Sequence, residues 1–184
     1  MAHYFLAIPI QAEDIEGLGK DLKKLRIYAD KREYNIRWIA LENYHLTLSF
    51  YGKLSENEIE QIKLDMENFG SNKFQIDLRD VSAFPTPERA RVVYLGARRS
   101  QALVELKNLL DEKIQVPPEN KEDFVPHITL ARLRSFKHIV DFISPVRRKR
   151  YNRLVVDRVS LYKSTNAKNF SLYEEVFTVH LDSK

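Results

Sequence analysis

The chain has 184 residues, of which 43% are hydrophobic and 30% are charged. These proportions are ordinary for one globular domain, or for two small lobes that share a cleft. Cysteine is absent, which excludes disulfides, thiol chemistry and thiolate metal sites. We find no apolar run as long as a membrane span and no signal-peptide pattern, so we expect a cytoplasmic protein that does not bind membranes.

Apolar periodicity predicts the order of elements in the first part of the chain. Ser55 and Glu58 form a capping-box pattern, which indicates the start of a helix. The early helix carries acidic residues near its start and basic residues near its end, as the helix dipole favours. We predict a strand at 4–10, a helix at 12–28, two extended pieces within 37–51, and a helix from 55 to 70.

The second part of the chain contains more strands, separated by a helix and by polar loops. Two consecutive prolines, Pro117 and Pro118, end the predicted helix. The predicted strands lie at 74–81, 91–97, 154–163 and 173–181, the helices at 101–114 and 135–143, and the loops at 84–87, 119–123 and 147–150.

One tetrapeptide pattern occurs twice, at residues 45–48 and 127–130. Each copy reads His, apolar, Thr, apolar. Because side chains alternate on a strand, the His and Thr of each copy lie on one face and the two apolar residues lie on the other. Each copy also follows a strand and a helix. This repeated order predicts two lobes packed about a pseudo-two-fold axis, with the two copies face to face.

Two imidazoles and two hydroxyls across a cleft suit acid–base chemistry on a phosphate. Imidazole titrates near neutral pH, so His45 and His127 can hold opposite protonation states, while Thr47 and Thr129 donate hydrogen bonds to phosphate oxygens. The residues alone leave open which histidine is the acid. A metal site is the rival interpretation, but no further ligand recurs in both copies. We therefore expect neither a metal nor another cofactor.

The motifs and their surroundings resemble the 2H phosphoesterase superfamily, and within it the RNA 2′,3′-cyclic phosphodiesterases of bacteria and archaea. The resemblance extends over essentially the whole chain and is most specific at 127–132. Ser49 stands where many relatives carry a basic residue. The stretches that carry the resemblance are 4–9, 37–38, 43–52, 91–96, 124–132 and 161–164.

The resemblance implies an α+β fold in which residues 1–184 form a single domain of two pseudo-symmetric lobes. Two antiparallel sheets would face a central cleft, with helices on the outside. It implies metal-independent hydrolysis of an RNA-terminal 2′,3′-cyclic phosphate to a 2′-phosphate, with His45 as general acid and His127 as general base. Thr47, Thr129 and Arg132 would bind the phosphate. The reverse reaction would join RNA ends through a 2′–5′ linkage. We expect a monomer whose partners are RNA ends or nucleotides with a cyclic phosphate.

Two alternatives to an RNA-end phosphodiesterase stay open. One is a phosphodiesterase for small cyclic-phosphate nucleotides or 2′–5′ oligonucleotides, and the other is a non-catalytic protein that binds RNA ends. Phe124 is the first candidate to stack on a base, ahead of Trp38, Phe50 and Tyr51. The basic run Arg147–Arg150 is equally consistent with contacts to RNA phosphates and with a solvated loop.

Overall fold

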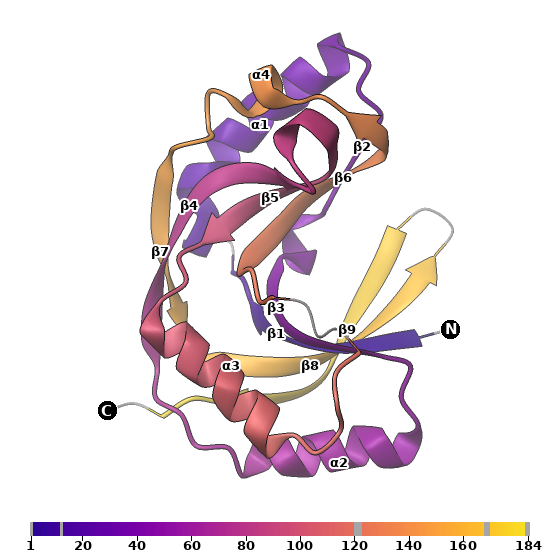
Figure 1. The fold of residues 1–184 in the computed structure, drawn as a ribbon, viewed down its shortest axis with the longest axis vertical. Helices are drawn as coiled ribbons and strands as arrows, with labels where there is room; N and C mark the ends of the chain where they lie inside the picture. Colours follow the sequence, from indigo (N-terminus) through magenta and orange to yellow (C-terminus); the bar gives the residue numbers. More distant parts are fainter. Residues whose placement is uncertain (1, 12, 120–122, 168–169, 183–184) are drawn as a thin grey trace.

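The computed structural model describes residues 2–11, 13–119, 123–167 and 170–182. Within these residues, nine strands form one antiparallel sheet in the order β7-β4-β5-β6-β3-β1-β8-β9, with β2 paired to β6 (Figure 1). The strands are β1 (Ala2–Pro9), β2 (Ile36–Trp38), β3 (His45–Gly52), β4 (Phe74–Phe84), β5 (Ala90–Ala97), β6 (His127–Lys137), β7 (Arg150–Val156), β8 (Arg158–Ala167) and β9 (Phe170–His180). The helices are α1 (Glu16–Lys31), α2 (Glu56–Glu67), α3 (Gln101–Lys113) and α4 (Val140–Ile143), with short 3₁₀ turns at Glu13–Ile15, Leu41–Asn43 and Pro87–Arg89.

The sheet consists of two halves that meet between β3 and β6. One paired position, Leu46 opposite Ile128, joins them. Helices α1 and α4 pack together outside the β7-β4-β5-β6 half, whereas α2 and α3 pack together outside the β3-β1-β8-β9 half (Figure 1). The α+β class and the outer helices are therefore confirmed, and the two predicted sheets are continuous at a single pair of residues.

Alternation along the strands explains how the sheet faces its helices. On β3 and β6 the apolar motif residues Leu46, Leu48, Ile128 and Leu130 are at most 2% exposed and belong to the core. The intervening polar residues are partly exposed. Burial of one face of each strand thus fixes which side chains the opposite face presents.

Local signals in the sequence locate the helices well. The capping box of α2 is present, because the Ser55 hydroxyl accepts from the Glu58 backbone N–H and the Glu58 carboxylate accepts from the Ser55 backbone N–H. A second serine, Ser100, caps α3 by accepting from the Leu103 backbone N–H. No described helix is long and apolar enough to cross a membrane.

Two predicted elements are wrong in extent. The helix predicted at 135–143 is shorter, because residues 135–137 continue β6 and only Val140–Ile143 are helical. The strand predicted at 154–163 is two strands, β7 and β8, interrupted at Asp157. The alternation of buried apolar residues changes phase here, from 154 and 156 to 159 and 161, and this shift marks the change of partner from β4 to β1. Part of the predicted 119–123 loop lies outside the described residues.

Candidate active site

The two motif copies begin β3 and β6, the central strands of the sheet. Leu46 opposes Ile128 in an antiparallel pair. Because the strands are antiparallel, each histidine lies on the same side of this pair as the threonine of the other copy. His45 and Thr129 lie on one side of the pair, and Thr47 and His127 lie on the other. The four predicted polar residues therefore gather on the open face at the joint between the two halves.

The same backbone contact holds both histidine rings. The Nδ1 of His45 lies 2.8 Å from the carbonyl oxygen of Asn43, and the Nδ1 of His127 lies 2.8 Å from that of Val125. A carbonyl oxygen only accepts, so each Nδ1 must carry the proton and donate it. In the neutral ring, Nε2 then keeps its lone pair. Each histidine consequently presents Nε2, and not Nδ1, to a ligand.

Aromatic rings enclose the imidazole of His45. The ring centroid of Phe5 lies 4.8 Å away and that of Tyr173 lies 5.1 Å away, edge-on. Behind Phe5, the ring of Tyr162 stacks on it at 5.4 Å with an interplanar angle of 16°. These contacts restrict the orientation of the ring and remove water from it.

The imidazole of His127 has a similar environment in the other half of the sheet. The rings of Phe84 and Tyr94 meet it edge-on, with centroids at 4.9 and 5.4 Å. These two rings stack on each other at 4.2 Å. These aromatic neighbours could not be predicted from the sequence, since their contacts with the histidines depend on strand pairing that no local pattern encodes.

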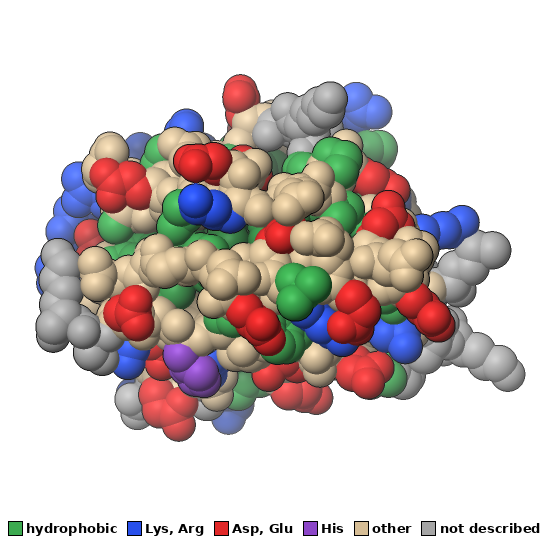
Figure 2. Space-filling model, turned by 90° about the horizontal axis from the view of Figure 1, so that it is seen from below, with side chains coloured by type: hydrophobic (Ala, Val, Ile, Leu, Met, Phe, Trp, Pro, Cys, Tyr) green, Lys and Arg blue, Asp and Glu red, His purple; other side chains and the backbone are tan. Residues whose placement is uncertain are grey.

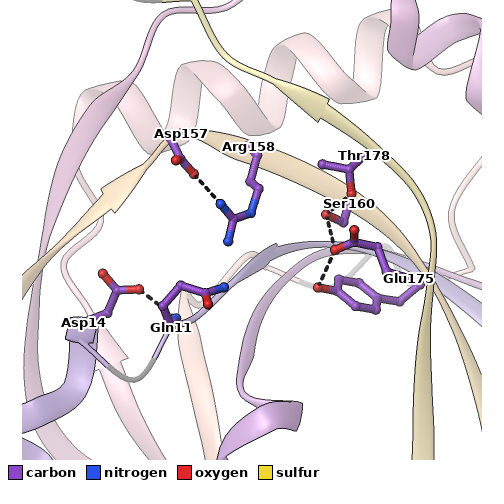
Figure 3. A network of polar contacts seen from close by, with 8 residues as sticks. Gln11, Asp14, Asp157, Arg158, Ser160, Glu175 and Thr178 are labelled. Atoms are coloured by element: carbon purple, nitrogen blue, oxygen red, sulfur yellow. Dashed lines mark hydrogen bonds and ion pairs between the residues drawn. The ribbon is translucent and has the colours of Figure 1, made fainter.

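Hydrogen bonds fix the hydroxyl end of the Tyr162 side chain. Its hydroxyl donates to the Glu175 carboxylate at 3.3 Å. The same carboxylate oxygen accepts from the buried Ser160 hydroxyl at 3.0 Å, and Ser160 also bonds with Thr178 at 2.6 Å (Figure 3). Burial, followed by the negative charge of Glu175, raises the pKa of Tyr162 to about 12. This tyrosine is therefore a neutral ring of the wall at physiological pH.

A pocket of about 390 Å³ opens beside His45. Arg132 and Arg37 stand opposite each other on β6 and β2, and both line this pocket. Their guanidinium groups give it positive charge, which suits a phosphate. His127 and Thr129 are not part of its wall and lie across the joint. The lining residues are His3, Phe5, Arg37, His45, Thr47, Phe50, Arg132, Ser164 and Tyr173.

Both histidines favour the neutral form in the unliganded protein. Burial is the largest cause and lowers the pKa of His45 to about 4, against a smaller upward effect of the hydrogen bond to Asn43. The charges of His127 and Arg132 lower it further. The pKa of His127 is also lowered, chiefly by burial and then by Arg132. Electrostatic coupling among these three groups indicates that they lie close together.

The aromatic residues predicted to stack on a base have different locations. Phe50 lines the His45 pocket. Phe124 lines a neighbouring pocket of about 370 Å³ beside the His127 strand. Tyr51 is 4% exposed and belongs to the core, so it cannot reach a ligand. Trp38 packs against the core, with the Arg26 guanidinium 5.3 Å above its ring.

The residues of the basic run at 147–150 have different surroundings. Lys149 forms an ion pair with the buried carboxylate of Asp21 at 2.8 Å, and the Tyr151 hydroxyl donates to the same carboxylate. Lys149 therefore anchors the segment to α1, while Arg150 lines a surface pocket. Within the described residues, no three His, Asp or Glu side chains are grouped so that they could hold a metal ion.

The model of the family described as LigT like Phosphoesterase matches residues 15–94 and 96–173. The chain is 28% identical to the RNA 2′,3′-cyclic phosphodiesterase of Methanocaldococcus jannaschii, over 94% of this chain and 96% of that protein. It is also 28% identical to the RNA 2′,3′-cyclic phosphodiesterase of Thermotoga maritima, over 94% and 92%.

Solved structures share the fold. Escherichia coli LigT in complex with 3′-AMP superposes with a TM-score of 0.72 and 25% identity, and the match covers 97% of each chain. TT0787 of Thermus thermophilus gives a TM-score of 0.74 at 21% identity, again over 97% of each chain. Both matches extend over nearly the whole chain.

Proposed function

Because the chain belongs to the LigT-like phosphoesterase family, we propose that it is a metal-independent hydrolase that opens 2′,3′-cyclic phosphates at RNA ends. The observation that carries this proposal is the pairing of Leu46 with Ile128 at the β3–β6 joint, which brings the two motif copies side by side. Relatives named RNA 2′,3′-cyclic phosphodiesterases support the substrate class.

Hydrolysis needs a base on one side of phosphorus and an acid on the other. Nε2 of His127 takes a proton from water, whose oxygen forms the new bond to phosphorus. The bond from phosphorus to the ribose 3′ oxygen breaks, and Nε2 of His45 gives that oxygen a proton. The product is a 2′-phosphate, and solvent then returns the proton from His127 to His45. Run backwards, with a 5′-hydroxyl in place of water, the same steps form a 2′–5′ linkage.

The remaining polar residues stabilise charge on the phosphate. The hydroxyls of Thr47 and Thr129 donate to the non-bridging oxygens, and the Arg132 guanidinium neutralises the charge that accumulates on them. Arg132 lines the pocket together with His45 and Thr47, which supports a shared ligand. These donors come from the protein, so the steps need no metal ion.

Substrate binding favours protonation of His45, the proposed acid. His45 needs a proton to act, although its pKa is lowered to about 4 in the unliganded protein. A bound phosphodiester anion counters the positive charge of Arg132, which contributes to this lowering, and it attracts a proton to the nearby ring. Burial still lowers the pKa of His45, and the hydrogen bond to Asn43 still raises it. Binding of the anion thus raises the pKa of His45 toward the range in which it can carry a proton.

The test offers the purified protein an RNA ending in a 2′,3′-cyclic phosphate, in the presence of a chelator. We expect conversion to a 2′-phosphate end by the wild type, and losses of at least about 10³-fold for His45→Ala and for His127→Ala. His138→Ala is the matched control, because His138 is exposed and lies outside the pocket. It should retain wild-type turnover.

Each alternative has its own outcome in the same assay. Binding of the RNA end without conversion by the wild type would indicate a non-catalytic RNA-binding protein. Equal turnover of a mononucleotide 2′,3′-cyclic phosphate and of the RNA would indicate a phosphodiesterase for small nucleotides. Normal turnover by either folded histidine variant would contradict the two-histidine mechanism.

A further inference from the structure

Five arginines line three adjoining surface pockets on the His127 half of the molecule. The pockets have volumes of about 370, 260 and 390 Å³. Arg98 lines all three, which joins them into one depression along the β4–β7 edge of the sheet and the segment between β5 and α3. We call this surface the arginine groove, and its arginines are Arg79, Arg98, Arg99, Arg150 and Arg153.

The groove carries an excess of positive charge. Two aspartates, Asp77 and Asp80, are its acidic residues. Asp77 accepts from the Arg153 guanidinium at 3.1 Å and lies 3.7 Å from that of Arg98. The side chains of Arg98 and Arg153 are nonetheless 66% and 70% exposed, so these are weak surface pairs that leave donors facing solvent. Guanidinium groups in this state suit the phosphates of a nucleic acid.

The arginine groove is continuous with the candidate active site. Its first pocket is lined by Phe124, Val125 and Tyr94 as well as by arginines. The Val125 carbonyl holds the imidazole of His127, and the Tyr94 ring meets that imidazole at 5.4 Å. A strand of phosphates that passes His127 would therefore enter the groove directly.

The face of the molecule that α2 forms has the opposite charge. Helix α2 contains five acidic residues and one lysine. Figure 2, viewed from the α2 side, shows Asp and Glu side chains spread over this face. Such an asymmetry repels a polyanion from one side of the protein and orients it toward the other.

We propose that the arginine groove binds the sugar–phosphate backbone of single-stranded RNA next to the terminal cyclic phosphate, and that Phe124 stacks on a base at its entrance. This inference rests on the proposed function. It extends that function from the reacting nucleotide to the nucleotides before it, and it makes the protein selective for oligonucleotides over mononucleotides. A mononucleotide cyclic phosphate reaches the histidines but has no further phosphates for the groove.

The test compares two triple variants. R98A/R99A/R153A removes three exposed charges from the groove, and K23A/K24A/K31A removes three exposed lysines from α1, outside the groove. A decamer RNA with a 3′-phosphate end reports binding without turnover, and kcat/KM is measured for a cyclic-phosphate decamer and for a mononucleotide 2′,3′-cyclic phosphate.

We expect R98A/R99A/R153A to weaken decamer binding by about tenfold or more. It should also reduce the slope of log affinity against log salt by about 2, since each phosphate contact on a single strand contributes about 0.7. Turnover of the mononucleotide should change by less than about twofold, as should decamer binding by the α1 variant.

Different results would refute the arginine groove and the proposed hydrolase function. Unchanged decamer binding and salt slope in R98A/R99A/R153A would overturn the groove, whatever the activity of the wild type. Equal losses on decamer and mononucleotide would also overturn it, because they would indicate a structural effect. Absence of hydrolysis by the wild type would refute the proposed function, whereas selective loss of decamer binding would still support the groove.

Discussion

At the residue scale, the two histidines share a backbone anchor but differ in their surroundings. Each donates Nδ1–H to the carbonyl two residues before it, so both present Nε2 to a ligand. His45, enclosed by Phe5 and Tyr173, has a pKa lowered to about 4, with burial as the largest cause. The proposed acid is thus a ring that releases its proton readily once it holds one.

These surroundings predict the pH dependence of catalysis. The productive form has His45 protonated and His127 neutral, so activity falls when pH rises above both pKa values and when it falls below both. Since both pKa values are lowered, the kcat/KM profile, which reports the free protein, should peak below pH 6.5. The kcat profile should peak at higher pH, because the bound phosphate anion raises both. A kcat/KM maximum at alkaline pH would contradict these assignments.

At the element scale, close approach of strands positions His127. Gly96 on β5 pairs with His127 on β6 and with Arg79 on β4. A Cβ added at Gly96 would lie 2.8 Å from the Arg79 carbonyl oxygen, which is backbone and cannot move away by a rotamer change. The absence of a side chain at this position lets β4 and β5 approach each other, and with them the Phe84 and Tyr94 rings that flank the imidazole.

Gly96→Ala should therefore destabilise the protein by about 1–3 kcal/mol, because the backbone of β4 must shift. It should also reduce turnover. Gly19→Ala is the matched control, since Gly19 lies inside α1 with no atom within 4 Å of the added methyl group. That change should stabilise the helix by about 0.5–1 kcal/mol and leave turnover unchanged. Denaturant unfolding and the cyclic-phosphate assay measure both effects, and a Gly96→Ala variant as stable as Gly19→Ala would refute the argument.

Within single strands, the direction of each side chain could be predicted from the sequence. Period-two alternation predicts that His45 and Thr47 share a face, and the partly exposed histidine beside the buried Leu46 confirms it. Register is not local, and so the pairing of Leu46 with Ile128 could not be read from either strand. The aromatic neighbours of both imidazoles depend on the same long-range pairing.

At the scale of the whole molecule, the site and the arginine groove are assembled from distant segments. The groove combines β4, β7 and the segment before α3, and sequence analysis identified only the run at 147–150. That run is divided, with Lys149 paired to Asp21 and Arg150 in the groove. The formal net charge of the chain is only +4, whereas the fold separates an acidic α2 face from a basic edge.

The two halves of the sheet meet at one pair of residues, and each contributes one imidazole. If both imidazoles act on one phosphate, they form a single catalytic unit, and removing either disables it. Losses from residues that act as a unit are not additive. The joint between the halves would then be essential to catalysis as well as to the fold.

A double-mutant cycle on the opening of an RNA 2′,3′-cyclic phosphate tests this directly. Turnover is measured for the wild type, His45→Ala, His127→Ala and the double variant, each confirmed as folded by circular dichroism. The two-histidine mechanism predicts that the double variant is within about tenfold of the weaker single variant. Losses that multiply in the double variant would show that the two imidazoles act independently and would contradict a shared phosphate between them.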